Sequence, residues 1–317
     1  MRKNRIGNTT LEVAPLAFGG NVFGWTIDAG TSEQLLDQFT GAGFNLIDTA
    51  DVYSRWKPGN TGGESEVIIG DWMKKRGKRD QVIIATKGGG DMGQGRKDIS
   101  RKYIIQAAEA SLKRLQTDHI DLYQTHWDVI DTPLEETLSA YQQLINEGKI
   151  RFVGASNYTA ERLEASIKVA KANSLPLYQS FQPEYNLYSR KGFEQALEKI
   201  CLDNNIGVIN YYSLAAGFLT GKYRTEADAG KSVRDGGSKQ YLNDRGYRIL
   251  EALDKLALQY KVQQASIAIA WLVARPVVSA PIASATSAAQ LETLTAGAQL
   301  ELSTESLALL DEASAWD

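Results

Sequence analysis

The sequence predicts an α/β fold: a closed (β/α)8 TIM barrel with an N-terminal β-hairpin and extra helices. The length of 317 residues suits one such barrel. Short apolar runs of strand character alternate with amphipathic stretches of helical period along almost the whole chain. The strand-like runs are residues 16–19, 45–48, 82–86, 120–126, 150–155, 178–182, 207–211 and 277–282. Eight repeats of a strand followed by a helix predict that the sheet closes on itself.

Helices are expected between these strands, where apolar residues recur at the spacing of one helical face. Thr159, shortly before Glu161, is typical of the residue that caps a helix at its N-terminus. The expected helices cover residues 32–42, 64–75, 101–114, 134–146, 159–172, 192–204, 266–274 and 287–296.

Two segments fall outside the repeat. Residues 2–6 and 11–13, joined by a turn, predict a hairpin that closes the amino-terminal mouth of the barrel. Residues 212–260 form a long insertion that ends in a helix around residues 243–260. Because long loops in compact domains usually serve function, we expect this insertion to bind cofactor or substrate.

Composition predicts one soluble domain over residues 1–317. With 43% hydrophobic residues, 23% charged residues and a net charge of −3, the chain offers no basic surface for nucleic acid. No apolar stretch is long enough to insert into a membrane, and no signal peptide is apparent, so a cytoplasmic location is expected. The one cysteine, Cys201, is compatible with a reducing compartment and is expected to fill space inside a helix.

Four polar residues lie at or just past the ends of predicted strands: Asp48, Tyr53, Lys87 and His126. The carboxyl ends of parallel strands meet at one rim, so these side chains are expected to converge there. Together they could transfer a proton to a carbonyl oxygen, which predicts an enzyme. Lys87 alone would also suit the Schiff-base nucleophile of an aldolase, but that reading leaves Tyr53 unexplained.

The motifs in this order resemble the aldo-keto reductase family, in particular its bacterial branch that is similar to potassium-channel β subunits. The resemblance covers nearly the whole chain and rests on the number and order of its motifs. They are Asp48-Thr49-Ala50-Asp51-Val52-Tyr53, Gly62-Gly63-Glu64-Ser65-Glu66, Ala85-Thr86-Lys87, Asp121-Leu122-Tyr123-Gln124-Thr125-His126, Gly154-Ala155-Ser156-Asn157, Gln182-Pro183-Glu184-Tyr185-Asn186 and Gly217-Phe218-Leu219-Thr220-Gly221-Lys222-Tyr223.

The resemblance implies reversible, NADPH-dependent reduction of aldehydes or ketones, with the four rim residues as the catalytic set. Tyr53 would donate the proton, and Lys87 would help by lowering the phenol pKa. Asp48 would hold Lys87 and balance its charge, because buried charges require partners. A neutral His126 would orient the substrate carbonyl.

The resemblance also implies where the cofactor binds. The nicotinamide amide would contact Ser156, Asn157 and Gln182, and Tyr211 would stack on the ring. The pyrophosphate and adenosine phosphate would lie against two later segments, through Gly217, Leu219, Gly221, Lys222, Ser284, Thr286, Ser287 and Gln290.

The chain departs from the family pattern at the adenosine end. Many relatives carry a basic residue near Ser287 and an asparagine near Leu294, and this chain has neither. NADPH is the expected cofactor, with NADH also possible. No metal ligand set is expected.

Trp25, Trp56 and Trp127 lie in or near rim loops and are expected to wall a substrate pocket, although loop tryptophans can also be packing residues. The basic loop at residues 54–60 favours polar or acidic substrates. A second hypothesis is a nucleotide-bound regulatory subunit that senses redox state and turns over slowly. The expected partner is a small carbonyl or alcohol substrate, and the sequence leaves the oligomeric state open.

Overall fold

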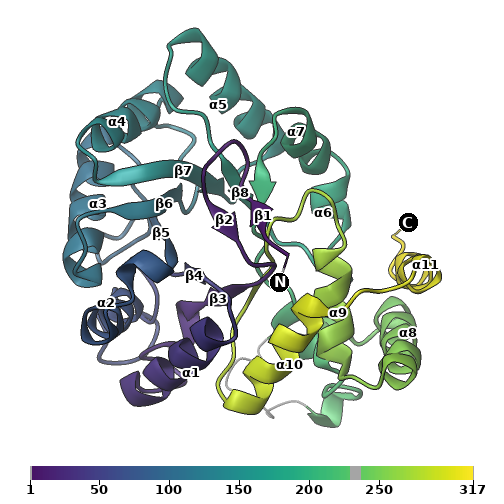
Figure 1. Ribbon diagram of the computed structural model, residues 1–317. Helices are drawn as coiled ribbons and strands as arrows, with labels where there is room; N and C mark the ends of the chain where they lie inside the picture. The colour runs from purple at the N-terminus through teal and green to yellow at the C-terminus, as the bar shows by residue number, and fades with distance from the viewer. Residues whose placement is uncertain (1, 229–236, 317) are drawn as a thin grey trace.

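A parallel sheet of eight strands forms the centre of the computed structural model, which describes residues 2–228 and 237–316 (Figure 1). Around the sheet the strand order is β10-β3-β4-β5-β6-β7-β8-β9, so the order in space follows the chain. The strands are β3 (Ala17–Gly19), β4 (Leu46–Asp48), β5 (Ile83–Gly88), β6 (Ile120–Thr125), β7 (Ile150–Ser156), β8 (Ser180–Gln182), β9 (Gly207–Val208) and β10 (Ile282–Ala283).

Backbone hydrogen bonds close the sheet between its last two strands. The amide of Val208 donates to the carbonyl of Val277 at 3.0 Å, and the amide of Ile282 donates to the carbonyl of Asn210 at 2.9 Å. The barrel prediction is therefore confirmed. The predicted last strand is misplaced, because residue 278 makes only an isolated bridge to Val208 and regular pairing begins after Pro281, which has no amide hydrogen.

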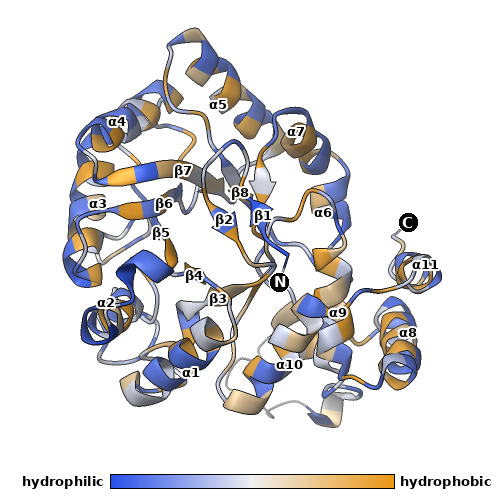
Figure 2. Cartoon of the chain, in the orientation of Figure 1, coloured by the Kyte–Doolittle hydropathy of each residue, from blue (hydrophilic) through white to orange (hydrophobic). Residues whose placement is uncertain are grey.

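Helices surround the barrel, and Figure 2 shows that they carry both hydrophilic and hydrophobic residues. Several begin at a side-chain cap: for example, Thr159 accepts the amide of Arg162, as expected of a cap. The helices are α1 (Ala29–Gly41), α2 (Glu64–Arg76), α3 (Arg101–Leu115), α4 (Leu134–Asn146), α5 (Ala160–Ala172), α6 (Lys191–Glu194), α7 (Leu197–Asp203), α8 (Asp244–Tyr260), α9 (Gln264–Val273), α10 (Ala288–Gln299) and α11 (Thr304–Ala313). In the described part of the chain, no helix has the length and apolar character needed to cross a bilayer.

One expected helix is interrupted. The segment predicted as residues 192–204 divides into α6 and α7, because Ala196 adopts φ −144° and ψ −44°, outside the helical region. The break lets Phe193 pack on Tyr185, with ring centroids 4.8 Å apart, while α7 buries Ile200 and Cys201. Cys201 is a free, fully buried thiol, as predicted.

The N-terminal hairpin closes one end of the barrel, as predicted. Strand β1 (Asn4–Arg5) pairs antiparallel with β2 (Glu12–Val13). Ile6, Leu11 and Val13 are buried in one apolar cluster with side chains from the barrel strands. That end is filled by packing, so the chemistry is expected at the opposite end, where the strands terminate.

The long insertion adds cover to the opposite end of the barrel. It contains short 3-10 turns at Ala215–Thr220, Glu226–Asp228 and Ser238–Tyr241, followed by α8, whose N-cap is Asn243. The predicted helix at the end of the insertion is thus confirmed. Residues 229–236 of the insertion lie outside the described residues.

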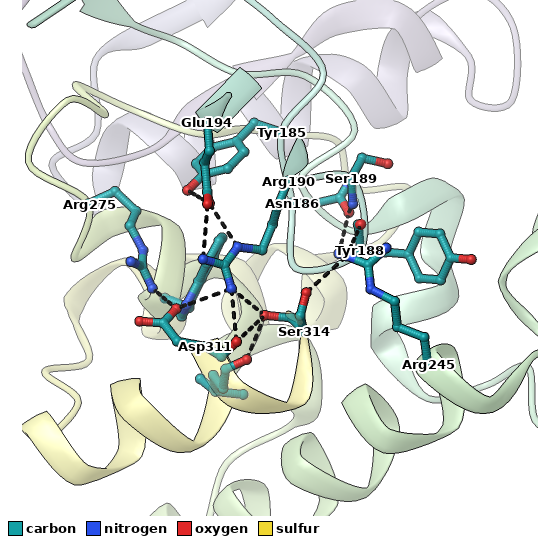
Figure 3. Close-up of polar contacts among 12 residues, drawn as sticks. Tyr185, Asn186, Tyr188, Ser189, Arg190, Glu194, Arg245, Arg275, Asp311 and Ser314 are labelled. Carbon is teal, nitrogen blue, oxygen red and sulfur yellow. Dashed lines mark hydrogen bonds and ion pairs between the residues drawn. The ribbon is translucent and has the colours of Figure 1, made fainter. Parts of the chain in front are cut away.

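The C-terminal helix α11, which the sequence did not predict, packs against α8. Figure 3 shows the polar cluster that ties it to the barrel through Arg190, Asp311 and Ser314.

Candidate active site

Three of the four predicted rim residues form one hydrogen-bonded chain. Asp48 is the last residue of β4, Tyr53 lies in the loop that follows, and Lys87 is near the end of β5. The Lys87 ammonium donates to Asp48 Oδ2 at 2.8 Å and to the Tyr53 hydroxyl oxygen at 2.9 Å. His126 follows β6 directly, and its ring centre is 6.0 Å from that of Tyr53.

Lys87 is a structural cation in this site. It is fully buried and donates a third hydrogen bond to the carbonyl of Thr49 at 2.7 Å, so all three of its ammonium hydrogens are used. Burial alone would lower the pKa of Lys87. The charge of Asp48 and the hydrogen bonds to Asp48 and Tyr53 outweigh burial and raise the pKa of Lys87 above its ordinary value. A protonated, fully hydrogen-bonded amine is unsuited to Schiff-base chemistry, which disfavours the aldolase alternative.

The Tyr53 phenol remains protonated at neutral pH. Burial raises the pKa of Tyr53, Lys87 opposes this effect, and the net direction is upward. The expectation that Lys87 lowers the pKa of Tyr53 below its ordinary value is therefore wrong in its net direction. Loss of contact with water, which cannot be read from the sequence, outweighs the effect of the Lys87 charge. Since Lys87 donates to the phenol oxygen, the phenol keeps its own hydrogen as a donor. The acceptor of that hydrogen is Asp48 Oδ2 at 3.5 Å, a long contact that a substrate carbonyl oxygen could replace.

His126 is neutral. Burial lowers its pKa well below 6.5, and the positive charges of Lys87 and Lys97 act in the same direction. Its Nδ1 is buried and has no hydrogen-bond partner within residues 2–228 and 237–316. A neutral imidazole keeps one N–H donor, which suits a group that orients a carbonyl.

A cavity of about 790 Å³ opens over these residues and extends toward α10. Such a volume is in the range of sites for small ligands and cofactors. Most of the predicted cofactor and pocket residues line it: Trp56, Trp127, Ser156, Asn157, Gln182, Tyr211, Gly217, Lys222, Ser284, Thr286 and Gln290.

Four of the predicted cofactor and pocket residues do not line this cavity, and neither does Lys87, which lies behind Asp48 and Tyr53 as their hydrogen-bond partner. Leu219 is fully buried, and Gly221 ends the 3-10 turn with φ +75°. Ser287 caps α10, with its side chain accepting the amide of Gln290. Trp25 contacts Trp56 edge-on, with centroids 5.5 Å apart, and touches the cavity wall only through Trp56. Their assigned roles stay predictions.

Hydrogen bonds order the part of the wall next to Asp48. Gln182 donates to Asp48 Oδ1 at 2.9 Å, and Ser156 donates to the carbonyl of Gln182 at 2.8 Å. The Tyr211 hydroxyl donates to Asn157 Oδ1 at 2.9 Å, which fixes both side chains at the strand ends. These contacts place amide and hydroxyl groups in a fixed arrangement before any ligand arrives.

The structure adds wall residues that sequence reasoning missed. Asn21 follows β3 and its Oδ1 accepts a hydrogen bond from Ser284 at 2.6 Å. Gln263 precedes α9, and Thr293 lies on α10. Asn21 follows a strand, as the catalytic candidates do, and this signal could have identified it. Gln263 and Thr293 carry no local signal, because only the packing of helices around the cavity brings them there.

Asp51 lies buried behind the rim and is unusual. Its amide donates to the carbonyl of Lys87 at 3.0 Å, yet neither carboxylate oxygen has a hydrogen-bond partner in the described part of the chain. Burial, reinforced by the charge of Glu66, raises the pKa of Asp51 to about 7. The proton therefore binds more tightly in the folded state than in the unfolded chain.

This shift predicts a pH-dependent effect of Asp51→Asn on stability. An unfolded aspartate has a pKa of about 3.9, so wild type loses stability as pH rises from there to about 7, and the loss is complete above that value. Asparagine avoids this loss. We expect the variant to gain about 2.5–3 kcal/mol relative to wild type between pH 5 and pH 8, measured by urea unfolding at both pH values.

The matched control is Asp131→Asn, at an exposed position, which should not change the difference between the two pH values. A constant offset between Asp51→Asn and wild type at both pH values would contradict the assignment of a raised pKa.

The sequence model of the aldo/keto reductase family matches residues 15–315. The chain is 36% identical to the aldo-keto reductase YhdN of Bacillus subtilis (strain 168), over 93% of this chain and 88% of the relative. It is 31% identical to the protein tas of Escherichia coli (strain K12), over 98% and 97%. It is also 32% identical to a probable voltage-gated potassium channel subunit beta of Oryza sativa subsp. japonica, over 92% and 89%. Fold, rim geometry and similarity over nearly the full length agree, and the chain belongs to the aldo/keto reductase family.

Proposed function

We propose that this protein is an NADPH-dependent reductase that converts aldehydes or ketones to alcohols and runs in reverse on suitable alcohols. The observation that carries the proposal is the chain from Asp48 through Lys87 to Tyr53, which ends at a large cavity. A reduced nicotinamide, when bound, supplies the hydride. Family membership supports an oxidoreductase in general, and the residue roles below are part of the proposal.

Tyr53 donates a proton to the carbonyl oxygen as the carbonyl carbon is reduced. Its phenol is protonated at neutral pH, and Lys87 holds its oxygen in place. Once the proton has left, the cation next to that oxygen stabilises the phenolate. In the oxidative direction, the phenolate accepts the proton of the alcohol. His126 donates a hydrogen bond that orients the carbonyl.

The residues along the cavity fit a nicotinamide dinucleotide. Ser156, Asn157 and Gln182 present amide and hydroxyl groups that could bind a carboxamide. They lie beside the four predicted catalytic residues, called the tetrad below: Asp48, Tyr53, Lys87 and His126. Three successive residues, Ala215, Ala216 and Gly217, have left-handed φ values of 47°, 54° and 91°. Such backbone strain concentrates at ligand sites, and Lys222 beside it adds positive charge for a pyrophosphate. The adenosine end would lie at Thr286 and Gln290 on the N-terminal side of α10.

The test is a titration with NADPH, and separately with NADH, followed by tryptophan fluorescence, because Trp56 and Trp127 line the cavity. Loss of the reduced cofactor's absorbance is then measured with a panel of aldehydes, ketones and dicarbonyls. We expect binding and carbonyl-dependent oxidation with NADPH. Activity with NADH alone would correct the cofactor, and absence of binding and oxidation with both would overturn the proposal. A cytoplasmic location is part of the proposal and is compatible with the free thiol of Cys201.

A nucleotide-bound regulatory subunit is the second candidate. The similarity to a probable potassium channel subunit beta favours it. A tightly held cofactor that exchanges slowly, with little turnover on every carbonyl tested, would support that function. Fast turnover with freely exchanging cofactor would count against it.

A further inference from the structure

Lys97 places a positive charge beside Trp127, a residue of the cavity wall. It lies in the loop between β5 and α3, and its ammonium is 4.9 Å from the ring centre of Trp127. The Trp127 ring lines the cavity and stacks on His126, with centroids 3.6 Å apart and planes at 17°. The distance from the Lys97 ammonium to the centre of the His126 ring therefore cannot exceed the sum of the Lys97–Trp127 and Trp127–His126 distances.

No carboxylate in the described part of the chain lies within ion-pair distance of Lys97. The neighbouring Asp98 pairs with Arg96 at 3.3 Å and also accepts the amide of Ser100. Asp91, in the same loop, accepts the amides of Gly93 and Gly95. Lys97 is exposed and does not itself line the cavity, so its ammonium is open to a ligand that extends from the cavity past the Trp127 ring.

The charge of Lys97 acts on His126: after burial and Lys87, it is a further cause of the lowered pKa of this imidazole. A second cation, Arg55, approaches the same loop from the segment after Tyr53: a β-carbon built on Gly93 would lie 3.6 Å from its guanidinium. The one carboxylate of the tetrad, Asp48, is already bound by Lys87. Hydrogen bonds from loop amides and the charge of Arg55 lower the pKa of Asp91, so Arg55 has a carboxylate nearby. Lys97 has none within ion-pair distance among the described residues.

We propose that the substrate is a small aldehyde or ketone that carries an anionic group, phosphate or carboxylate, and that Lys97 binds this group. The inference rests on the proposed function, because the carbonyl must lie between Tyr53 and His126 for the anion to reach Lys97. The distances above match a span of a few carbon–carbon bonds between the two groups. Trp56 and Trp127 enclose the carbon chain and exclude water, which strengthens the contact between the charges.

Matched substrates test the proposal in the full-length protein with its cofactor. Glyceraldehyde 3-phosphate is compared with glyceraldehyde, and succinic semialdehyde with butyraldehyde, so that each pair differs in an anionic group. We expect wild type to have the higher kcat/KM for the anionic member of at least one pair, and the pair identifies whether phosphate or carboxylate is preferred. That preference should weaken with increasing salt.

Lys97→Met should reduce the anionic preference by about 5- to 20-fold, mainly through KM, because one charge-assisted contact of a partly exposed cation is lost. Lys97→Arg should keep most of it, since the charge remains. The control Lys113→Met removes an exposed lysine from the far end of α3, next to the hairpin-closed end of the barrel, and should keep the wild-type preference.

The outcomes separate this inference from the proposed function. Wild type that reduces charged and neutral aldehydes equally, or Lys97→Met that keeps the wild-type preference, overturns the anionic substrate and leaves the reductase intact. Wild type that reduces no carbonyl compound with either nicotinamide cofactor overturns the proposed function, and the inference falls with it.

Discussion

Tyr53→Phe is expected to lower kcat for carbonyl reduction by about 10²- to 10⁴-fold, the usual contribution of a general acid. Phenylalanine fills the same space but has no proton to donate and no oxygen for Lys87 to hold. The charge that develops on the carbonyl oxygen would then lack its nearest donor. The measurement is the initial rate of NADPH oxidation with a carbonyl substrate that wild type reduces.

Cofactor binding should change little in Tyr53→Phe, because the predicted cofactor contacts lie on other residues. A fluorescence titration with NADPH checks this point and shows that the variant is folded. The matched control is Tyr247→Phe on α8, which removes a hydroxyl from a side chain that is 39% exposed and lies outside the cavity wall. If Tyr53→Phe turns over every active substrate at the wild-type rate, Tyr53 is not the acid.

Arg190→Met is expected to lower the free energy of unfolding by about 3–5 kcal/mol, the cost of breaking a buried ion pair from one side. Arg190 is 8% exposed and binds Glu194 through two hydrogen bonds, of 2.7 and 3.0 Å. It also donates to the carbonyl of Asp311 at 3.0 Å and to the Ser314 hydroxyl at 2.8 Å, at the end of α11 (Figure 3). Without the guanidinium, the Glu194 carboxylate loses its cation, and α11 keeps only its other contacts, such as those of Trp271 and Arg275 with Asp311.

Urea unfolding at neutral pH measures the loss. Lys199→Met on α7 is the control, because Lys199 and Asp203 form an ion pair of similar length, 2.7 Å, with side chains 80% and 57% exposed. Exposed pairs of this kind contribute about 0.3–0.5 kcal/mol. Equal losses in the two variants would show that the cluster around Arg190 gains nothing from its burial.

Much of the fold was predictable, because the period of apolar residues reports which residues face a core. The strands at Asp48 and Lys87 and the hairpin that closes the barrel follow from that pattern. Helix α11 and the break at Ala196 were not predicted. Helix α11 depends on contacts between distant segments, such as Arg190 with Ser314. The break at Ala196 depends on how Phe193 packs against Tyr185, which the period of apolar residues does not report.

The candidate site was predictable to the level of which residues lie on the rim. The sequence could not give the direction of the Tyr53 pKa, because this depends on how much water the folded loops exclude. The sequence predicted Trp25 on the pocket wall, whereas in the structure Trp56 lines the cavity and Trp25 contacts the Trp56 ring. The sequence did not distinguish Asp51 from the other residues of its motif. Its lack of hydrogen-bond partners among the described residues is a property of the folded state alone.

By itself the sequence determined the barrel, the family and the convergence of four polar residues at the strand ends, since these follow from periodicity, topology and motif order. Only the tertiary structure decided which atoms meet: the three hydrogen bonds of Lys87 and the position of Lys97 against Trp127. The physical reason is that hydrogen bonds and pKa values depend on distances of a few ångströms and on local burial. Packing among loops far apart in the chain fixes both.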